Sequence, residues 1–438
     1  MARSITAAVQ QIKQQLHMHL RPVDIHAACQ SVGYDWRERV LGPVLTVQAL
    51  VLQILHATAM TGVSRLTGVG FSASAYCQAL QRLPVEMLRK LLRQVVTRQR
   101  HNTAAVADWR GHRVFLVDGS SCSMPDVPAL QRRFGQPTGQ QPGCGFPVAH
   151  LLALFDAYTG MLVDVLASSW RIHDLARVAE LHPRLQAGDV LVGDRGFCSF
   201  AHVALLQEQG LHALIRVHGQ RHVSFRLQQH VWAGRPWPLR LGPDDQVTLW
   251  HRTANLSRVM SREAYESLPE TLILRELRYR VVQPGYRTRA VTLVTTLLDA
   301  EAYPAAALAE LYQRRWQAEV NLRHLKETLG LRVLRSQSVA GVEREILAFA
   351  LVYNLICAVR TVLARHLQTT PDRIGLLDVL RLLRHGLRPA EVAIVVNPDR
   401  PGRYQPRVVK RRPLGYSRMT QPRAELKREL LRNSRRLT

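Results

Sequence analysis

Cysteine is scarce in this chain, and its spacing is irregular. Six cysteines are spread over 438 residues, and no two of them form a Cys-x-x-Cys pair. They are Cys29, Cys77, Cys122, Cys144, Cys198 and Cys357. A zinc ribbon and a disulfide-stapled scaffold both need regular, closely spaced cysteines, so this pattern argues against both. We therefore expect free thiols in a reducing compartment.

Long uninterrupted apolar runs are also missing from the early part of the sequence. The first twenty residues carry Gln, Lys and His where an export signal needs an apolar stretch. The run from Val44 to Leu55 is short and is broken by Gln48 and Gln53, which predicts a buried helix and not a membrane span. We expect a cytoplasmic protein.

Acidic residues are few compared with basic ones. The chain has 33 Asp and Glu against 59 Lys and Arg, which gives a net charge of +26. With 47% hydrophobic residues it has enough apolar surface for a sizeable core, which excludes a wholly disordered basic protein. A charge of this size indicates a polyanionic partner. Nucleic acid is the favoured partner, and an anionic membrane surface is the competing one.

The order of apolar patterns along the chain predicts an α/β fold in four parts. Residues 1–105 have helical periodicity and form either a DNA-binding domain or a scaffold with a solvated basic face. Three adjacent strands followed by alternating helices and strands predict a mixed sheet over 106–217, completed by helices over 300–366. Residues 218–299 are strand-like and predict a β-rich insertion. The remaining residues, 367–438, predict a helical and basic region.

Two aspartates follow buried apolar strands. Asp118 closes VFLVD, and Asp194 closes VLVGD. In α/β sheets, groups at the carboxyl ends of strands converge on one edge, where binding sites form. Aspartate is also a common turn residue, so either position taken alone could simply belong to a turn.

A polar row lies on the helix predicted from Pro304 to Gly330. Tyr312, Arg315, Glu319 and Lys326 are spaced i, i+3, i+7 and i+14, which on an ideal helix confines them to an arc of roughly 60°. Apolar residues flank the row on both sides, and this places it against the body of the protein. An amphipathic helix with a fortuitous Arg315–Glu319 ion pair is the alternative.

Together these residues predict a metal-dependent phosphodiester chemistry. Three carboxylates that converge on one spot repel one another, and bound divalent cations relieve that repulsion. Oxygen ligands favour Mg²⁺ or Mn²⁺. Two such ions can hold the attacking and leaving oxygens of an in-line displacement, while neighbouring cationic side chains bind phosphate.

At this point the sequence resembles the DDE transposases of bacterial insertion sequences. It is most similar to the cut-and-paste group whose last motif is Tyr-x2-Arg-x3-Glu-x6-Lys. The resemblance covers about residues 110–360, with Asp118 in VDGSS, Asp194 in GDRGF and all four residues of the last motif in place. It implies a ribonuclease-H-like catalytic core, with a β-rich insertion between the second aspartate and the glutamate.

The resemblance also implies roles for these residues. Asp118, Asp194 and Glu319 would bind two Mg²⁺ ions, for which Mn²⁺ would substitute. Water and then the freed 3′-OH would attack the DNA there, cutting the transposon end and joining it to target DNA. Tyr312, Arg315 and Lys326 would contact phosphates. The N-terminal region would recognise the terminal inverted repeats of double-stranded DNA, and a homodimer would hold two ends in a synaptic complex.

Several alternatives stay open at this stage. Arg195 either contacts DNA beside Asp194 or is a surface arginine after a turn. We expect Asp174 to cap a helix over 173–185. Trp232, Trp237 and Trp250 are expected to pack in a core, although one of them could stack on a flipped base. The rival functions are a catalytically silent DNA-binding regulator derived from a transposase and a related nuclease that cuts without joining.

Overall fold

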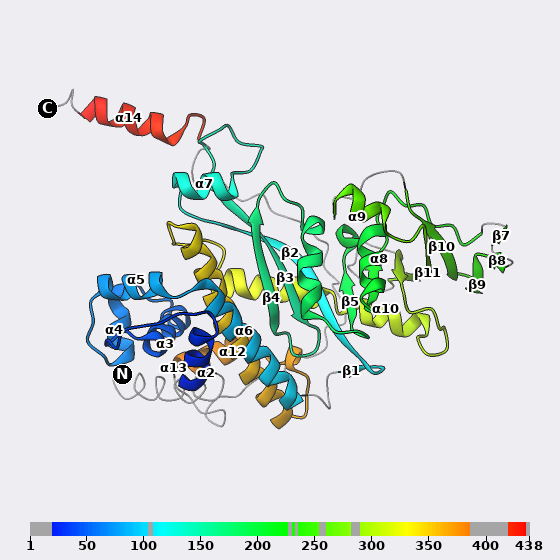
Figure 1. Ribbon diagram of the computed structural model, residues 1–438, viewed down its shortest axis with the longest axis horizontal. Helices are drawn as coiled ribbons and strands as arrows, with labels where there is room; N and C mark the ends of the chain where they lie inside the picture. Colours follow the sequence, from blue (N-terminus) through cyan, green and yellow to red (C-terminus); the bar gives the residue numbers. More distant parts are fainter. Residues whose placement is uncertain are drawn as a thin grey trace.

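A mixed ten-stranded sheet forms the centre of the molecule in the computed structural model (Figure 1). The structure describes residues 20–103, 108–226, 230–232, 235–253, 260–281, 290–385 and 419–434. The strands lie in the order β4-β3-β2-β5-β6-β12-β11-β10-β9, and the short β1 pairs with β2. Helices cover both faces of this sheet, so the protein belongs to the predicted α/β class.

The first five strands of the sheet have the ribonuclease-H-like arrangement. Three antiparallel strands, β2, β3 and β4, are followed by β5 and β6, which run parallel to β2 and to each other. Their bounds, with those of β1, are β1 Asp108–Trp109, β2 His112–Ser123, β3 Val148–Asp156, β4 Leu162–Ser169, β5 Val190–Gly193 and β6 His212–Arg216. This topology confirms the predicted fold class.

The strands of the predicted insertion extend this same sheet. β12 pairs with β6, and β11, β10 and β9 follow in antiparallel order. The bounds are β7 His230–Trp232, β8 Arg235–Trp237, β9 Leu239–Gly242, β10 Asp245–His251, β11 Thr271–Arg280 and β12 Ala290–Thr295. β7 and β8 form a separate two-stranded sheet, and the short helix α9 (Arg262–Glu266) precedes β11. The region is β-rich, as predicted, and is continuous with the core sheet.

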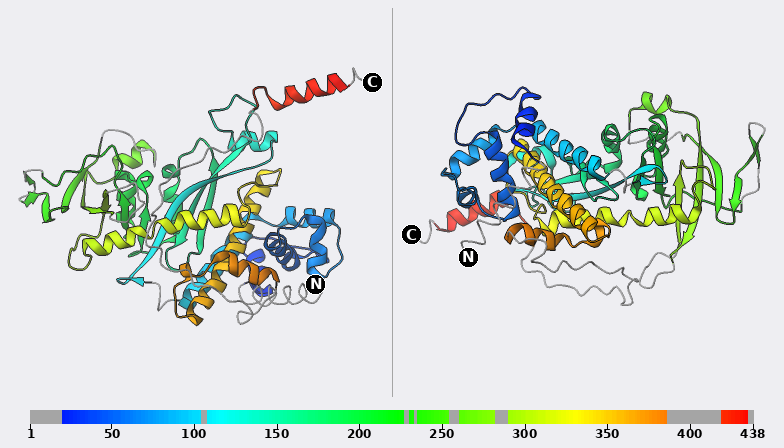
Figure 2. Two further views of the ribbon diagram at one scale, coloured as in Figure 1. Left: turned by 180° about the vertical axis from the view of Figure 1, so that it is seen from behind. Right: turned by 90° about the horizontal axis from the view of Figure 1, so that it is seen from below.

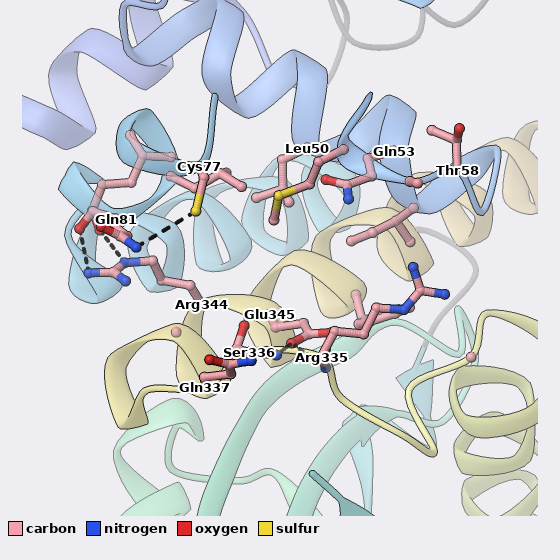
Figure 3. Close-up of a pocket in the computed structure, with 18 of the residues that line it drawn as sticks. Leu50, Gln53, Thr58, Cys77, Gln81, Arg335, Ser336, Gln337, Arg344 and Glu345 are labelled. Carbon is pink, nitrogen blue, oxygen red and sulfur yellow. Dashed lines mark hydrogen bonds between the residues drawn. The ribbon is translucent and has the colours of Figure 1, made fainter. Parts of the chain in front are cut away.

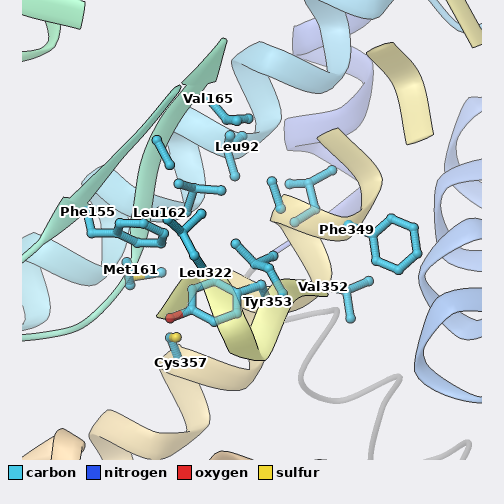
Figure 4. Close-up of a cluster of buried hydrophobic side chains, with 14 of the residues drawn as sticks. Leu92, Phe155, Met161, Leu162, Val165, Leu322, Phe349, Val352, Tyr353 and Cys357 are labelled. Atoms are coloured by element: carbon cyan, nitrogen blue, oxygen red, sulfur yellow. The ribbon is translucent and has the colours of Figure 1, made fainter. Parts of the chain in front are cut away.

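Alternate side chains of the central strands enter two different hydrophobic cores. Val114 and Leu116 of β2 pack with the helices α6, α11 and α12, while Phe115 and Val117 pack with α8 on the opposite face. Figure 4 shows part of the first core, where Phe155 and Leu162 of the sheet meet Leu322 and Tyr353 from helices. The period of two in a strand therefore assigns each strand residue to one face of the sheet.

The long helix α12 (Val339–His366) is the centre of the first core. By length and composition it could cross a membrane, but 94% of its most apolar window is buried inside the protein. The other helices have these bounds: α2 Pro22–Gln30, α3 Pro43–Leu55, α4 Val63–Thr67, α5 Ala73–Arg82, α6 Val85–Thr103, α7 Pro128–Phe134, α8 Phe200–Glu208, α10 Ala305–Gln313, α11 Trp316–Arg323, α13 Leu376–His385 and α14 Arg423–Ser434. One-turn 3₁₀ helices are η1 Met60–Gly62, η4 Arg195–Phe197 and η6 Pro371–Arg373.

The N-terminal helices share the first core with the sheet. Val47 and Leu52 of α3 and Leu88 of α6 belong to the same buried cluster as Leu116 of β2. The helical region is therefore packed onto the sheet and α12 (Figure 2) through one continuous apolar interior. The predicted domain boundaries remain predictions. Residues 386–418 and 435–438 of the predicted basic C-terminal region lie outside the described residues, and α14 lies between them.

Two predicted helices differ from the structure. The segment expected as one helix over 173–185 forms two 3₁₀ helices, η2 (Asp174–Ala176) and η3 (Val178–Arg184), and Pro183 lies inside the second. The helix expected from Pro304 to Gly330 is divided into α10, α11 and a π-helical turn η5 (His324–Thr328). The break between α10 and α11 comes from i→i+3 hydrogen bonds, in which Arg314 and Arg315 N–H donate to Leu311 and Tyr312.

Candidate active site

Three adjacent parallel strands end in a row of polar side chains. The pairing Leu116↔Val192 brings Asp118 level with Asp194, and the pairing Gly193↔Ile215 brings Asp194 level with Arg216. Val114, Leu116, Val190, Val192 and Leu214 all face the first core. Because strand residues alternate, Asp118, Asp194 and Arg216 face that same side, at the carboxyl edge of β2, β5 and β6.

Asp118 was expected to end its strand, but β2 continues to Ser123. The edge arises because β5 stops at Gly193, so among the described strands β2 from Asp118 onward pairs with β3 alone, and only its last residue, Ser123, forms an isolated parallel bridge to Val333 on the other side. Asp194 leaves β5 and caps the 3₁₀ helix η4, where its Oδ1 accepts a hydrogen bond from the Gly196 N–H at 2.7 Å. Asp194 therefore has the turn-capping role that was the alternative for it, and its role in a site stays a prediction.

Helices α10 and α11 lie across this row and supply the third carboxylate. Leu308, Leu311 and Leu322 bury the inner faces of the two helices in the first core. Arg315, between the two helices, forms an ion pair with Glu319, and its Nη1 lies 3.9 Å from Oδ2 of Asp118. The predicted Arg315–Glu319 pair thus exists, and it also joins the helix to the carboxylate on β2.

Burial makes the charge of Asp118 costly. Desolvation raises the pKa of Asp118 from 3.8 to about 6, although Arg315 and the Gly119 N–H, which donates to Oδ1 at 2.9 Å, both lower it. The carboxylates of Asp194 and Glu319 raise the pKa further. The three acidic side chains are thus close enough to interact electrostatically, and one arginine offsets part of their repulsion.

The remaining predicted phosphate ligands occupy different environments. Lys326 is half-buried in the π-helical turn. Burial raises the pKa of the Cys122 thiol, and the charge of Lys326 opposes that rise, which places Lys326 near the far end of β2. Tyr312 is only 7% exposed, so its hydroxyl is almost closed off from solvent. Arg195 is exposed directly after Asp194. The structure places Arg315 and Tyr312 beside the carboxylates, with Lys326 further along β2 and Arg195 on the surface.

The donor set fits a divalent cation in its chemistry. Asp118, Asp194 and Glu319 offer hard oxygen ligands, and their mutual repulsion is what a cation would relieve. Within the described ranges, however, no three His, Cys, Asp or Glu side chains are arranged to hold one ion. The guanidinium of Arg315 is paired with two of the carboxylates. We conclude that Arg315 would have to release Glu319 for a cation to be held there.

Sequence reasoning missed two residues of this region. Arg216 closes the apolar run HALIR just as Asp194 closes VLVG, and that parallel would have identified it. Tyr279 of β11 faces the first core. Burial raises the pKa of its hydroxyl, and the charges of Arg216 and Arg315 lower that pKa. Its position next to the site depends on the pairing of β11 with β12, which no local sequence pattern specifies.

Asp174 does not have its predicted role. The residue at the N-cap of η2 is His173, so the expectation of an Asp174 cap is wrong. Its carboxylate instead lies against β2, where a side-chain carbon added to Gly119 would come within 2.0 Å of Asp174 Oδ2. His150 Nδ1 is 3.8 Å from the other oxygen. The glycine after Asp118 is therefore needed for space, which a sequence reading of Asp-Gly as a turn does not predict.

The predicted tryptophans and the cavities lie apart from the carboxylates. Trp250 is 1% exposed and Trp237 is 8% exposed, which confirms core packing for these two, while the side chain of Trp232 lies outside the described residues. A cavity of about 800 Å³ lies between the N-terminal helices and α12 (Figure 3). Gln81, Arg344 and Glu345 line it, and none of the three predicted carboxylates does. It is separate from the candidate active site.

Comparison with known proteins agrees with this geometry. The family model of the transposase DDE domain matches residues 109–355, which is more than half of the chain and contains every carboxylate of the site. The chain belongs to this family of transposases. Its members are DNA-cutting enzymes that generally use divalent metal ions, so DNA is the partner that the strongly basic composition indicated.

Two individual proteins are similar over most of the chain. The transposase InsG for insertion sequence element IS4 of Escherichia coli (strain K12) is 23% identical over 363 residues, covering 78% of this chain and 77% of that protein. The cryo-EM structure of a piggyBac transposase synaptic complex with hairpin DNA is also similar. The match covers 86% of this chain and 80% of the piggyBac chain, with 9% sequence identity and a TM-score of 0.45. That score is too low to carry the assignment, which the family match supplies.

Proposed function

We propose that this protein cuts DNA at the terminal repeats of an insertion element and joins the freed ends to target DNA, with Asp118, Asp194 and Glu319 as catalytic carboxylates. The observation that carries the proposal is the row on β2 and β5, faced by Arg315 and Glu319 from the helices above. It combines acidic oxygen donors with a cation at one sheet edge, and phosphoryl transfer needs both.

In this proposal, Asp118, Asp194 and Glu319 would hold two divalent cations, with Mg²⁺ as the natural ion and Mn²⁺ as a substitute. Such ions supply charge neutralisation and an activated nucleophile. The side chain of Arg315 leaves Glu319 and moves to a DNA phosphate, which keeps its charge paired. Lys326 and the exposed Arg195 bind the DNA backbone on either side. Tyr312, which is buried, contacts a phosphate once its hydroxyl becomes accessible.

The partners follow from the same proposal. The N-terminal helices recognise the terminal inverted repeats, and two copies of the chain hold two ends in a homodimeric synaptic complex. The protein works in the cytoplasm, on the nucleoid. Because the polar row lies at the carboxyl ends of β2, β5 and β6, the DNA in this proposal lies across these strand ends and below α11.

The test uses linear DNA that carries the two ends of the element, with and without separate target DNA. In Mg²⁺, wild type is expected to release the element and to produce joined products when target DNA is present. Asp194→Ala and Glu319→Ala should produce neither. Cleavage that survives either substitution contradicts the site assignment, and nicked ends that never join identify a nuclease. End binding by wild type without any cleavage identifies a silent regulator.

A further inference from the structure

The parallel strands deliver a third polar side chain to the edge, and it is basic. Arg216 is the last residue of β6 and lies level with Asp194 through the pairing Gly193↔Ile215. On its other side β12 pairs Leu293 with Arg216. The edge thus runs from Asp118 through Asp194 to Arg216, and the charge changes sign at β6.

The guanidinium of Arg216 is half-buried, and it has no carboxylate partner among the residues that the structure describes. Its neighbour Asp194 uses its Oδ1 for the N–H of Gly196, and the other acids of the site pair with Arg315. A half-buried charge without a counter-ion is unfavourable in an isolated fold. The arrangement becomes favourable when an anion from outside the chain occupies this position.

Two tyrosines that face the first core, Tyr279 and Tyr312, lie within electrostatic range of Arg216. Burial raises the pKa of Tyr279, and both Arg216 and Arg315 lower it. Burial also raises the pKa of Tyr312, which the same two arginines lower. Leu293 of β12 pairs with Arg216 on one side and with Leu277 of β11 on the other. Tyr279 lies two residues beyond Leu277 on the same face of the sheet, toward the same edge as the site. Hydroxyl and guanidinium donors together suit a phosphate oxygen.

We propose that Arg216, with the hydroxyl of Tyr279, forms a phosphate-binding subsite for the DNA backbone beside Asp194, on the side of the β-rich insertion. This inference rests on the proposed function and extends it. The subsite binds a phosphodiester next to the one that is cut, so it fixes the direction of the strand across the sheet edge toward β11. Arg216 here is a DNA-binding residue, and the reacting atoms remain with the carboxylates.

The experiment measures equilibrium binding of the full chain to a fluorescein-labelled duplex of the element's end, in Ca²⁺, across a series of salt concentrations. Each phosphate contact contributes about 0.9 to the slope of log affinity against log salt. We expect Arg216→Ala to weaken binding about tenfold or more and to reduce the slope by about one. Arg216→Lys should keep the slope and recover only part of the affinity, because lysine lacks the planar fork. Tyr279→Phe should weaken binding and leave the slope unchanged.

The matched control is Arg262→Ala, which removes the same charge from α9, where Arg262 lies 3.9 Å from Glu266. It should leave affinity and slope close to wild type. An Arg216→Ala protein that binds with the wild-type slope overturns the subsite, as does one whose Tm without DNA falls while the slope stays the same. Failure of wild type to cut in Mg²⁺ would instead contradict the proposed function, and the binding slopes in Ca²⁺ are measured without any cleavage.

Discussion

Replacing Asp118 by asparagine is expected to stabilise the folded protein at neutral pH while it removes the proposed catalytic group. Asparagine has the same shape and keeps an oxygen for the Gly119 N–H, so packing and this hydrogen bond are preserved. What the substitution removes is a buried negative charge, since the Asp118 side chain is only 14% exposed. Function and stability therefore oppose each other at this position.

The magnitude follows from the pKa of Asp118, which burial raises from 3.8 to about 6. Between these two values the folded state holds a proton that the unfolded chain has lost, so the stability of wild type falls as the pH rises through this window. Above pH 6 the effect is complete, and a shift of this size corresponds to about 3 kcal/mol. The advantage of Asp118→Asn should be near that value at pH 8 and vanish near pH 4.

Urea unfolding at pH 4, 6 and 8 measures this difference, and Asp35→Asn, an exposed aspartate in the N-terminal region, serves as the matched control. Added Mg²⁺ should stabilise wild type more than Asp118→Asn, because a ligand that binds only the folded state raises its stability. The reasoning is refuted if Asp118→Asn is less stable than wild type at pH 8, or if its advantage is the same at pH 4.

Two further substitutions test the packing around the site and one helix cap. Gly119→Ala should cost about 1–3 kcal/mol of unfolding free energy, because its Cβ would meet Asp174 Oδ2 at 2.0 Å. Combining this substitution with Asp174→Ala should recover most of the loss. The control, Gly139→Ala, adds its Cβ in open space and should leave the unfolding free energy unchanged. Additive effects in this cycle would contradict the clash. Ser72→Ala should cost about 1 kcal/mol because Ser72 accepts the Ala75 N–H at the start of α5, and Ser74→Ala, whose side chain is exposed within the helix, should cost less. Equal losses for the two serines would mean that the cap is not what stabilises α5.

The buried strands and the mixed character of their sheet could be predicted because both are encoded locally. Apolar runs such as VFLV and VLVG specify buried strands, and a crossover segment between them specifies parallel pairing. The strand-end position of Asp194 followed from this pattern. The same rule, applied to the apolar run HALIR, identifies Arg216 as a polar residue at a strand end. The position of Arg216 can therefore be predicted from the sequence.

Other features depend on contacts between distant segments and could not be read from local patterns. The insertion was predicted as β-rich, but its continuity with the main sheet depends on β12 pairing with β6 across about eighty residues. The room for Asp174 against Gly119 depends on how η2 crosses β2. Local 3₁₀ hydrogen bonds break the predicted helix at Arg315 although its helical periodicity continues through this position. A helical wheel with ideal 100° steps cannot predict such a break.

The domain limits and the catalytic roles remain predictions of a different kind. The sequence places Tyr312, Arg315, Glu319 and Lys326 on one face, and the structure brings Arg315 and Glu319 to Asp118. Neither observation measures a reaction. What the fold adds is the physical reason for the grouping, because parallel strands and the helix above them meet at a single edge.

The most direct measurement is the single-turnover rate at which one labelled element end is cut in Mg²⁺ by wild type, Asp194→Asn and Asp372→Asn, the last an exposed aspartate in η6. If the carboxylates on β2, β5 and α11 carry the reaction, Asp194→Asn should cut at least about a thousandfold more slowly, a loss of about 4 kcal/mol of transition-state stabilisation. Asp372→Asn should cut at the wild-type rate. A rate for Asp194→Asn within tenfold of wild type, in a protein that still binds the end, would contradict the account.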